Sequence, residues 1–461
     1  MKNLFKIFII VLIFIFSSCS DKDLDPTLVE EKDVETSITS EEDLQGLIYG
    51  TYDVLSSYFV YGRDLIAFGE VRSDNNFPNG NSGRFSDVGA MVMNDASSYA
   101  ADTWRQLYAT IANANIIINL DLSTIEGQEN SMEHIQGQAL AVRALAHFDL
   151  LKLYGQQHVD NGGEAALGIP YVTDYKGENL VPERGTVAEN KTQIYQDLDK
   201  ALAMMSEAEN GSCEVFTTHA VNALISRVAV YFGDWDIALT SSKLVIDSGE
   251  YSIIGASNYA TTFNTDCTMN AVFEIAVSET DEPANNSLAT IYQGETYADL
   301  QVQDNVLDLF DDSDVRGVGK MIGYEDTHPT QLRNLGKYPF SWMNIPIIRY
   351  EEVVLNYAEA LYESGDSPAA LTWLNEIPSH RNATVYSAVN KENILKERRK
   401  ELIFEGFRFD DLARTKQDIP NPNPLQATHN GPAYGSYKYA FPIPRAEMNA
   451  NPNMKQNEGY Y

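Results

Sequence analysis

Residues 231–239 read YFGDWDIAL, and residues 362–371 read YESGDSPAAL. In both stretches Gly-Asp follows a segment with helical spacing, and an alanine stands five positions after the glycine. A glycine permits the tight turn that ends one helix, and the small alanine lets the next helix approach closely. Each stretch therefore predicts a pair of antiparallel helices.

This helix–turn–helix pattern is typical of tetratricopeptide repeats, but the two copies lie 132 positions apart. One such pair cannot bury its own apolar face, so an insertion from about 250 to 345 has to loop out and return to the same stack. We expect a mostly α-helical fold of interrupted tetratricopeptide-like repeats, at about 99–247 and 347–406, with a long irregular, loop-rich insertion between them. Helices are expected at about 186–206, 217–232, 235–247, 347–364, 368–377 and 391–406.

The folded part is expected to begin at residue 39. Thr39 and Glu42, three positions apart, resemble a capping box, and apolar residues at helical spacing follow from Leu44 to Tyr58. We treat residues 39–461 as a single domain.

Two irregular segments are the candidate ligand-binding regions. The insertion is rich in Asn, Asp, Gly, Thr and Tyr, and a second irregular stretch runs from Arg72 to Asp87. Irregular segments on a rigid scaffold commonly carry binding residues. The six candidates for ligand binding are Phe77, Arg84, Phe85, Tyr292, Tyr324 and Trp342. The competing interpretation is that these side chains pack within the loops or contact a partner protein.

Other aromatic residues are not among the six candidates for ligand binding. The insertion also contains Tyr297, Tyr338 and Phe340. By contrast, Trp104, Trp235 and Trp373 fall at helical spacing and are expected in the core.

The charge balance limits the partners. The chain has 461 residues, with 33 Lys plus Arg against 66 Asp plus Glu, and a formal net charge of −33. So negative a surface repels phosphates, which argues against nucleic acid and favours neutral or cationic partners. With 44% hydrophobic and 21% charged residues, the chain is expected to be globular.

The amino-terminal end predicts export. Lys2 and Lys6 accompany an apolar run of ten residues, 7–16, which is too short to cross a bilayer as a helix. Two serines then lead to Cys19, and together they look like a bacterial lipobox.

This pattern divides the first part of the chain into two segments. We expect residues 1–18 to be a lipoprotein signal peptide and residues 19–38 to be an acidic tether that starts at a lipidated Cys19. The alternative is an ordinary secreted protein with an unpaired Cys19.

The other two cysteines stay undecided. After export, Cys213 and Cys267 could form a disulfide, or they could remain free buried thiols, and their spacing favours neither.

Catalytic and metal motifs have little support. The sequence has no HExxH motif and no Gly-x-Ser-x-Gly elbow, so we expect no catalytic residue, no metal and no cofactor. Asp311, Asp312 and Asp314 miss the EF-hand spacing. They are expected to cap a turn beside Arg316, with a calcium site as the alternative.

A dense charged segment spans residues 397–408. Its carboxylates recur at four-residue steps among arginines, which predicts an ion-pair network that fixes helix packing rather than an acid–base pair. The residues concerned are Glu397, Arg398, Arg399, Glu401, Glu405 and Arg408.

Four segments, in order, resemble the SusD/RagB family of outer-membrane lipoproteins from Bacteroidetes. They are GQALAVRALAHFDLLKLYG at 137–155, the segment 347–362 with RYEEV and YAEA, ILKERRKELIFEGFRFDDLAR at 394–414, and the end of the chain from YAFPIP at 439–444. The third segment is the most specific. The chain departs from the family pattern at Pro378, which should end a helix that the family usually continues.

The resemblance implies a nutrient-binding lipoprotein at the surface of the outer membrane, without enzymatic activity. Family members sit as a hinged lid on a SusC-like TonB-dependent transporter and capture oligosaccharides, or in some cases oligopeptides. For this chain we expect a neutral glycan. The alternatives are an oligopeptide-binding lid of the RagB type, a surface glycosidase, and a scaffold that has no ligand of its own.

Overall fold

The computed structural model describes residues 37–175, 181–293, 297–325 and 328–460. The expected signal peptide (1–18), the lipidation site Cys19 and nearly all of the tether (19–38) lie outside these residues. Within the described ranges, no helix combines the length and the apolar character that a membrane span requires.

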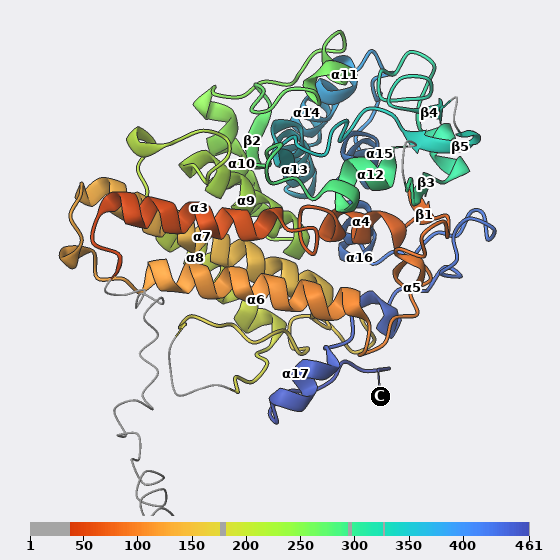
Figure 1. Cartoon of the computed structure of the whole chain (residues 1–461). Helices are drawn as coiled ribbons and strands as arrows, with labels where there is room; N and C mark the ends of the chain where they lie inside the picture. Colours follow the sequence, from red (N-terminus) through yellow and green to blue (C-terminus); the bar gives the residue numbers. More distant parts are fainter. Residues whose placement is uncertain (1–36, 176–180, 294–296, 326–327, 461) are drawn as a thin grey trace, which may run out of the picture.

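Helices make up most of the regular secondary structure, which confirms the mostly α-helical prediction (Figure 1). The main helices are α3 (Glu41–Ser56), α4 (Asp64–Val71), α6 (Ser98–Ile118), α7 (Glu129–Tyr154), α8 (Val187–Met204), α9 (Thr218–Phe232), α10 (Trp235–Ser248), α13 (Tyr350–Glu363), α14 (Ser367–Ser379), α15 (Lys391–Leu402) and α16 (Arg408–Arg414). The shorter helices are α5 (Ser86–Gly89), α11 (Tyr259–Thr262), α12 (Leu288–Tyr292) and α17 (Arg445–Ala450).

The first helix starts one residue later than the capping pattern suggested. The N-cap of α3 is Ser40, whose hydroxyl accepts a hydrogen bond from the backbone N–H of Asp43. The Asp43 carboxylate in turn accepts from the backbone N–H groups of Thr39 and Ser40. The predicted pair of Thr39 and Glu42 is therefore wrong by one position, because Ser40 and Asp43 satisfy the free N–H groups of the first turn.

The amino-terminal helices pack in series, with α6 beside both α3 and α7, and α8 against α7 (Figure 1). Nearly every residue of α7 from Met132 onward is buried. Trp104 of α6 is buried as predicted, and the edge of its ring meets the ring of Tyr154 with centroids 4.9 Å apart. Trp235 and Trp373 are partly buried and pack against core residues.

The two predicted helix pairs are α9–α10 and α13–α14. Gly233 ends α9 with a left-handed backbone (φ 77°), and Gly365 takes the same conformation (φ 91°) in the turn between α13 and α14. The buried Ala238 lies in a small core cluster with Ala229 and Ala360, where α10 packs against α13. The stack therefore closes across the insertion, as the repeat pattern predicted.

Strand pairing also brings the two ends of the insertion together. Near its start, β2 (Ala271–Ile275) pairs antiparallel with β6 (Ile345–Arg349) at its end. The helix expected over 347–364 is therefore shorter than predicted, because its first residues belong to β6 and α13 begins at Tyr350. Elsewhere β1 (Asn76–Pro78) pairs with β3 (Leu300–Val302), and β4 (Ile322–Glu325) pairs with β5 (His328–Asn334).

The helix expected over 391–406 ends at Leu402. Phe404 and Gly406 have left-handed backbones (φ 71° and 86°), which no α-helix contains. Glu405 therefore does not share a helix face with Glu397 and Glu401. The prediction that the helix ends at Pro378 is confirmed to within one residue, since α14 ends at the residue after it.

The charged segment forms the predicted ion-pair network. Glu401 is fully buried and lies 3.0 Å from Arg316, 3.0 Å from Arg349 and 2.9 Å from Arg381. Burial alone would raise the pKa of Glu401, but the three guanidinium groups hold it well below its usual range. The remaining members pair as well: Glu397 with Arg316, Arg398 with Asp411, Arg399 and Arg408 with Asp74, and Glu405 with Arg349.

The aspartates near Arg316 cap a turn, as predicted. Asp311 accepts from the backbone N–H of Asp314, and Asp314 pairs with Arg316 at 2.8 Å.

Replacing Glu401 with Gln should destabilise the protein by about 3–5 kcal/mol, because three buried guanidinium groups would lose their shared carboxylate. Urea unfolding measures the loss. The control is Asp247→Asn, which removes the exposed Lys243–Asp247 pair and should leave the unfolding midpoint nearly unchanged. Equal midpoints for the two variants would contradict this account of the network.

Candidate functional site

The two irregular segments singled out from the sequence meet in the structure. Strand β1 pairs with β3, and the Asn79 side chain donates to the Ala298 carbonyl at 2.6 Å. Arg84 forms an ion pair with Asp299 at 3.3 Å, and its guanidinium lies 4.1 Å from the centre of the Tyr297 ring. The stretch 72–87 is therefore bound to the insertion, although more than 200 residues separate Arg84 from Asp299.

Two of the six candidate residues offer no surface to a ligand in this structure. Phe85 and Tyr292 are each 0% exposed. The ring of Phe85 stacks on Tyr99 with centroids 5.0 Å apart, and Tyr292 stacks on Tyr338 at 6.0 Å. Each of these two rings fills the core beneath its loop. The expectation that they contact a ligand is therefore wrong.

The other four candidates remain accessible. Phe77 and Arg84 are partly buried, whereas Tyr324 and Trp342 are exposed. Tyr324 lies on the β4–β5 hairpin and Trp342 lies in the loop between β5 and β6. Phe77, Arg84 and Tyr324 thus lie on or beside strands that contact one another, whereas Trp342 lies in the loop that follows β5.

One exposed aromatic surface is formed by two stacked rings that the sequence did not identify as a pair. The rings of Phe340 and Trp342 stack with centroids 4.9 Å apart and an interplanar angle of 8°. They are 46% and 38% exposed, and we call this pair the aromatic platform. The sequence feature that could have identified this pair is the separation of two positions between Phe340 and Trp342 within an irregular segment, which lets both rings point to one side.

A narrow pocket with a volume of only about 40 Å³ adjoins the aromatic platform. Phe340 belongs to both, since it forms the platform and lines the pocket. At the rim, Thr265 and Asp266 are exposed, whereas Phe263 and Tyr338 are buried deeper in the lining. We call this cavity the platform pocket.

The cations that line the platform pocket are already neutralised. Lys337 and Arg349 both pair with Glu405. Burial lowers the pKa of Lys337, against the opposing effect of Glu405. The lining therefore offers no free positive charge to an anionic ligand.

Besides Glu405, two carboxyl groups line the platform pocket: Asp266, which is exposed, and Glu274, which is buried. Burial raises the pKa of Glu274 to about 7 and also raises the pKa of Asp266. Both carboxylates bind Asn344: Asp266 accepts from its backbone N–H at 3.0 Å, and Glu274 accepts from its side-chain amide at 3.3 Å.

One polar atom of the lining has no partner. The hydroxyl of Tyr338 is buried and makes no hydrogen bond, although a buried hydroxyl ordinarily makes one. Burial raises the pKa of this phenol well above its usual value, so it stays protonated, but its oxygen is buried too deeply for a solvent-sized group to reach it.

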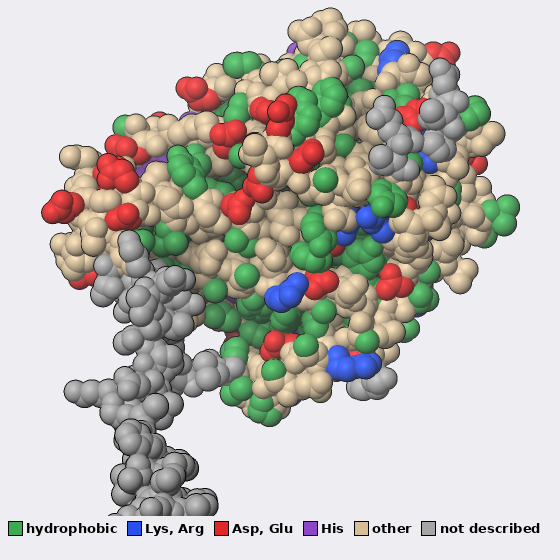
Figure 2. Space-filling model, in the orientation of Figure 1, with side chains coloured by type: hydrophobic (Ala, Val, Ile, Leu, Met, Phe, Trp, Pro, Cys, Tyr) green, Lys and Arg blue, Asp and Glu red, His purple; other side chains and the backbone are tan. Residues whose placement is uncertain are grey.

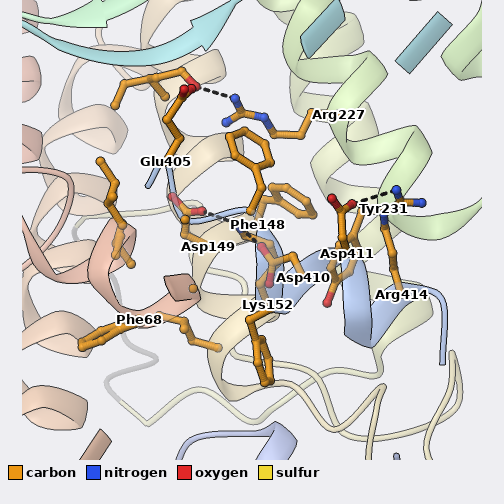
Figure 3. A pocket seen from close by; sticks show the side chains of 18 of the residues that line it. Phe68, Phe148, Asp149, Lys152, Arg227, Tyr231, Glu405, Asp410, Asp411 and Arg414 are labelled. Atoms are coloured by element: carbon orange, nitrogen blue, oxygen red, sulfur yellow. Dashed lines mark hydrogen bonds and ion pairs between the residues drawn. The ribbon is translucent and has the colours of Figure 1, made fainter. Parts of the chain in front are cut away.

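A second cavity, of about 880 Å³ including open solvent, lies between α4, α7, α9 and α16 (Figure 3). Several of its charges pair: Lys152 lies 3.2 Å from Asp149 and 3.0 Å from Asp410, and Arg414 lies 2.7 Å from Asp411, whereas Arg72 donates to the backbone carbonyls of residues 438 and 439. Among the described residues that line it, none has a buried polar side-chain atom without a partner. It therefore shows less unmet hydrogen-bonding capacity than the platform pocket.

A disulfide fixes one side of the platform pocket. Cys213 and Cys267 are bonded, with Cα atoms 5.6 Å apart, which settles the question that their spacing left open. The backbone N–H of Cys267 donates to Glu274 at 3.0 Å, and Glu274 also accepts from Asn344. The bond ties the segment before α9 to the loop before β2, and Glu274 connects that loop to the one that carries the aromatic platform. Within the described ranges, the potential metal-ligating group of Cys213, Cys267 and Glu274 has both sulfurs in this bond.

Comparison with known proteins gives matches along nearly the whole chain. A family model described as the SusD family matches residues 335–460, and one described as starch-binding and associating with the outer membrane matches residues 24–230.

Individual relatives agree with these models. SusD-like protein P2 from Formosa agariphila is 23% identical over 99% of both chains. The starch-binding protein SusD from Bacteroides thetaiotaomicron is 33% identical over 25% of this chain and 22% of its own. The structure of a putative sugar-binding protein from Bacteroides vulgatus superposes with a TM-score of 0.84 at 28% identity, covering 93% of this chain and 100% of its own.

Replacing Cys213 and Cys267 with Ser should lower the free energy of unfolding by about 2–5 kcal/mol, since the disulfide closes a loop with a sequence separation of 54. Urea unfolding with and without a thiol reductant tests this. The reductant should destabilise the unmodified protein and have no effect on the double variant. An unmodified protein that resists unfolding equally well in both conditions would argue against the role given to the bond.

Proposed function

The chain belongs to the SusD family, whose members are carbohydrate-binding proteins associated with the outer membrane, and on that premise we propose that it captures neutral oligosaccharides at the cell surface. It is anchored there through a lipidated Cys19 and passes its ligand to a SusC-like TonB-dependent transporter. It does not convert the ligand chemically.

The aromatic platform carries this proposal. Exposed stacked rings present flat apolar faces, and the C–H face of a pyranose ring is the matching surface on a sugar. The platform pocket adds hydroxyl and amide groups that can bond the ring hydroxyls. An apolar surface beside a few polar groups is the usual composition of a small-ligand site.

Charge favours a neutral ligand. The net charge is −33, and the face shown in Figure 2 carries many more acidic than basic side chains. At the platform pocket, the exposed Asp266 adds negative charge while the described cations of the lining are paired. Sulfated or uronic-acid-rich glycans would meet electrostatic repulsion there.

A glycosidase would need two carboxyl groups that flank the scissile bond. At the platform pocket, the exposed Asp266 and the buried Glu274 instead both bind Asn344. Their contacts support a role in holding the loop. Oligopeptide capture remains the alternative within the family and is one outcome of the test below.

Replacing Trp342 with Ala should weaken glycan binding at least about tenfold, because an exposed aromatic anchor would be lost from the platform. Calorimetric titration with a panel of neutral oligosaccharides, acidic oligosaccharides and short peptides measures the effect. The matched control is Tyr437→Ala, which removes a ring of similar exposure, 40% against 38%, from outside the insertion.

Binding to peptides alone would overturn the choice of ligand. The appearance of new reducing ends when the protein is incubated with a bound glycan would establish the glycosidase instead.

Replacing Cys19 with Ala should release the protein from the outer membrane, since the acyl chains would have no attachment site. Immunoblots of membrane and medium fractions measure the change, and Ser20→Ala serves as a control that should stay in the membrane. Retention of the Cys19→Ala protein in the membrane fraction would refute the lipid anchor.

A further inference from the structure

We propose that the Cys213–Cys267 disulfide is a redox switch: a dithiol that reduces this bond frees the loop of the aromatic platform and thereby weakens glycan binding. This inference rests on the function proposed above and adds a means of regulating the same site.

A reductant can reach the disulfide from solvent. Both cysteines line an open groove of about 470 Å³, and Cys267 is exposed. This volume lies within the roughly 300–1,000 Å³ of small-molecule sites, so a small dithiol has room to approach the sulfur atoms. Exposed disulfides are also the more easily reduced ones, whereas structural disulfides usually resist reduction.

The residues next to the two cysteines hold the platform loop. Glu214 directly follows Cys213 and accepts a hydrogen bond from the side-chain amide of Asn344 at 3.0 Å. Asp266 directly precedes Cys267 and accepts from the backbone N–H of Asn344 at 3.0 Å. We call these two hydrogen bonds the Asn344 clamp. Since Asn344 stands two positions beyond the second ring of the aromatic platform, the disulfide keeps that loop in place through the clamp.

Two features favour opening of the clamp once the bond is broken. Glu274 also accepts from the Asn344 side chain, so three carboxyl groups share one asparagine. Burial, together with the charges of Asp266 and Glu214, raises the pKa of Glu274 to about 7, because the three groups repel one another. Cys267 has a left-handed backbone (φ 51°), which is unfavourable for a residue with a Cβ atom and which a freed loop can relax.

The reduction is an exchange between two sulfur pairs. One thiolate of the dithiol attacks the exposed Cys267 sulfur, the S–S bond breaks, and Cys213 leaves as a thiolate. The second thiolate of the dithiol then attacks the mixed disulfide and closes the reductant into its own disulfide. The protein gains two electrons and two protons and keeps two thiols, and the dithiol loses the same number of each.

Glu274 is placed to protonate the thiolate that leaves first. A carboxyl oxygen of Glu274 lies 3.5 Å from the Cys213 sulfur. With a pKa of about 7, this carboxyl carries a proton in much of the protein at neutral pH. The charged groups that face it, Asp266 and Glu214, are both acidic, and the cations of the platform pocket pair with Glu405. Glu274 regains its proton from solvent, which holds those that the dithiol released.

The first experiment measures glycan binding in both redox states. The full chain carries Cys19→Ala, which leaves only this pair of its three cysteines. Linear neutral hexasaccharides of glucose, mannose and xylose are titrated calorimetrically into oxidised protein and into protein reduced with dithiothreitol. For a hexasaccharide that binds, reduction should weaken binding at least about tenfold. The Cys213→Ser/Cys267→Ser variant should bind as weakly as the reduced protein, with or without the reductant.

Linkage gives a reciprocal check. A ligand that prefers the oxidised protein must stabilise the disulfide by the same factor. A saturating hexasaccharide should therefore lower the reduction potential of the bond by about 30 mV for a tenfold preference. Equilibration with mixtures of reduced and oxidised dithiothreitol, followed by thiol alkylation, measures this shift.

Asn344→Ala tests the clamp while the disulfide is intact, so the variant keeps the cross-link. It should bind weakly in both redox states, with less than about a twofold response to reduction, because the route from the bond to the platform is cut. The matched control is Asn451→Ala, which removes another buried asparagine, one that donates to the Pro182 carbonyl. The control should keep the tenfold response.

Glu274→Gln tests the proton donor. The rates of reduction by dithiothreitol are compared for the unmodified protein and the variant at pH values below and above 7, so that the pH dependence of the reductant cancels in their ratio. The unmodified protein should be reduced faster below about pH 7, where Glu274 carries its proton, and should lose this advantage above it. A ratio that does not change with pH would show a purely structural effect and refute the proton transfer.

Hydrogen exchange separates the switch from the proposed function. On reduction, the backbone N–H groups of Asn344 and of Val277, which donates to the Asn344 side chain, should exchange faster, while those of α7 stay protected at short exchange times. Equal glycan binding in both redox states leaves glycan capture standing and refutes the switch. If no hexasaccharide binds, the proposed function fails and regulation of binding fails with it. Faster exchange confined to the clamp would then still support release of the loop, and unchanged exchange would refute that too.

Discussion

Buried guanidinium–carboxylate contacts hold the returning end of the insertion against the helical stack. Glu401 of α15 accepts hydrogen bonds from Arg316 within the insertion and from Arg349 in its last strand, which are 85 and 52 positions away in sequence. Arg381, which follows α14, supplies the third guanidinium. An unpaired charge at so buried a place costs several kcal/mol. The chain is therefore restricted to arrangements in which these distant segments meet.

The same contacts give the candidate site a fixed base. Arg349 and Lys337 share Glu405, and Lys337 directly precedes the buried Tyr338 of the platform pocket. On the other side, the Cys213–Cys267 disulfide and Glu274 hold the loop through Asn344. The aromatic platform thus projects from a loop that is anchored at both ends. A loop ordered before binding loses less conformational entropy when it takes up a ligand.

The positions of helices and the burial of helical residues were predicted well from the periodicity of apolar residues. The exposure of residues in the irregular segments was not. The Gly-Asp turns at 233 and 365 gave the repeat pairs, and Trp104 lies in the core as expected. Phe85 and Tyr292 lie in irregular segments whose composition resembles that around the exposed aromatic residues, but tertiary contacts bury both rings. Phe340 became part of the candidate site only because the loop after β5 places it beside Trp342.

The amino-acid sequence by itself determined the helical repeats, the acidic character and the segment that supplies the carboxylates of the charged network, because helical spacing, turn chemistry and net charge are local or additive properties. Only the tertiary structure decided which aromatic rings face solvent, which partners the buried arginines take, and that Cys213 meets Cys267. Those outcomes depend on segments that are far apart in the chain. Their proximity is set by the burial of the whole core, which no local pattern encodes.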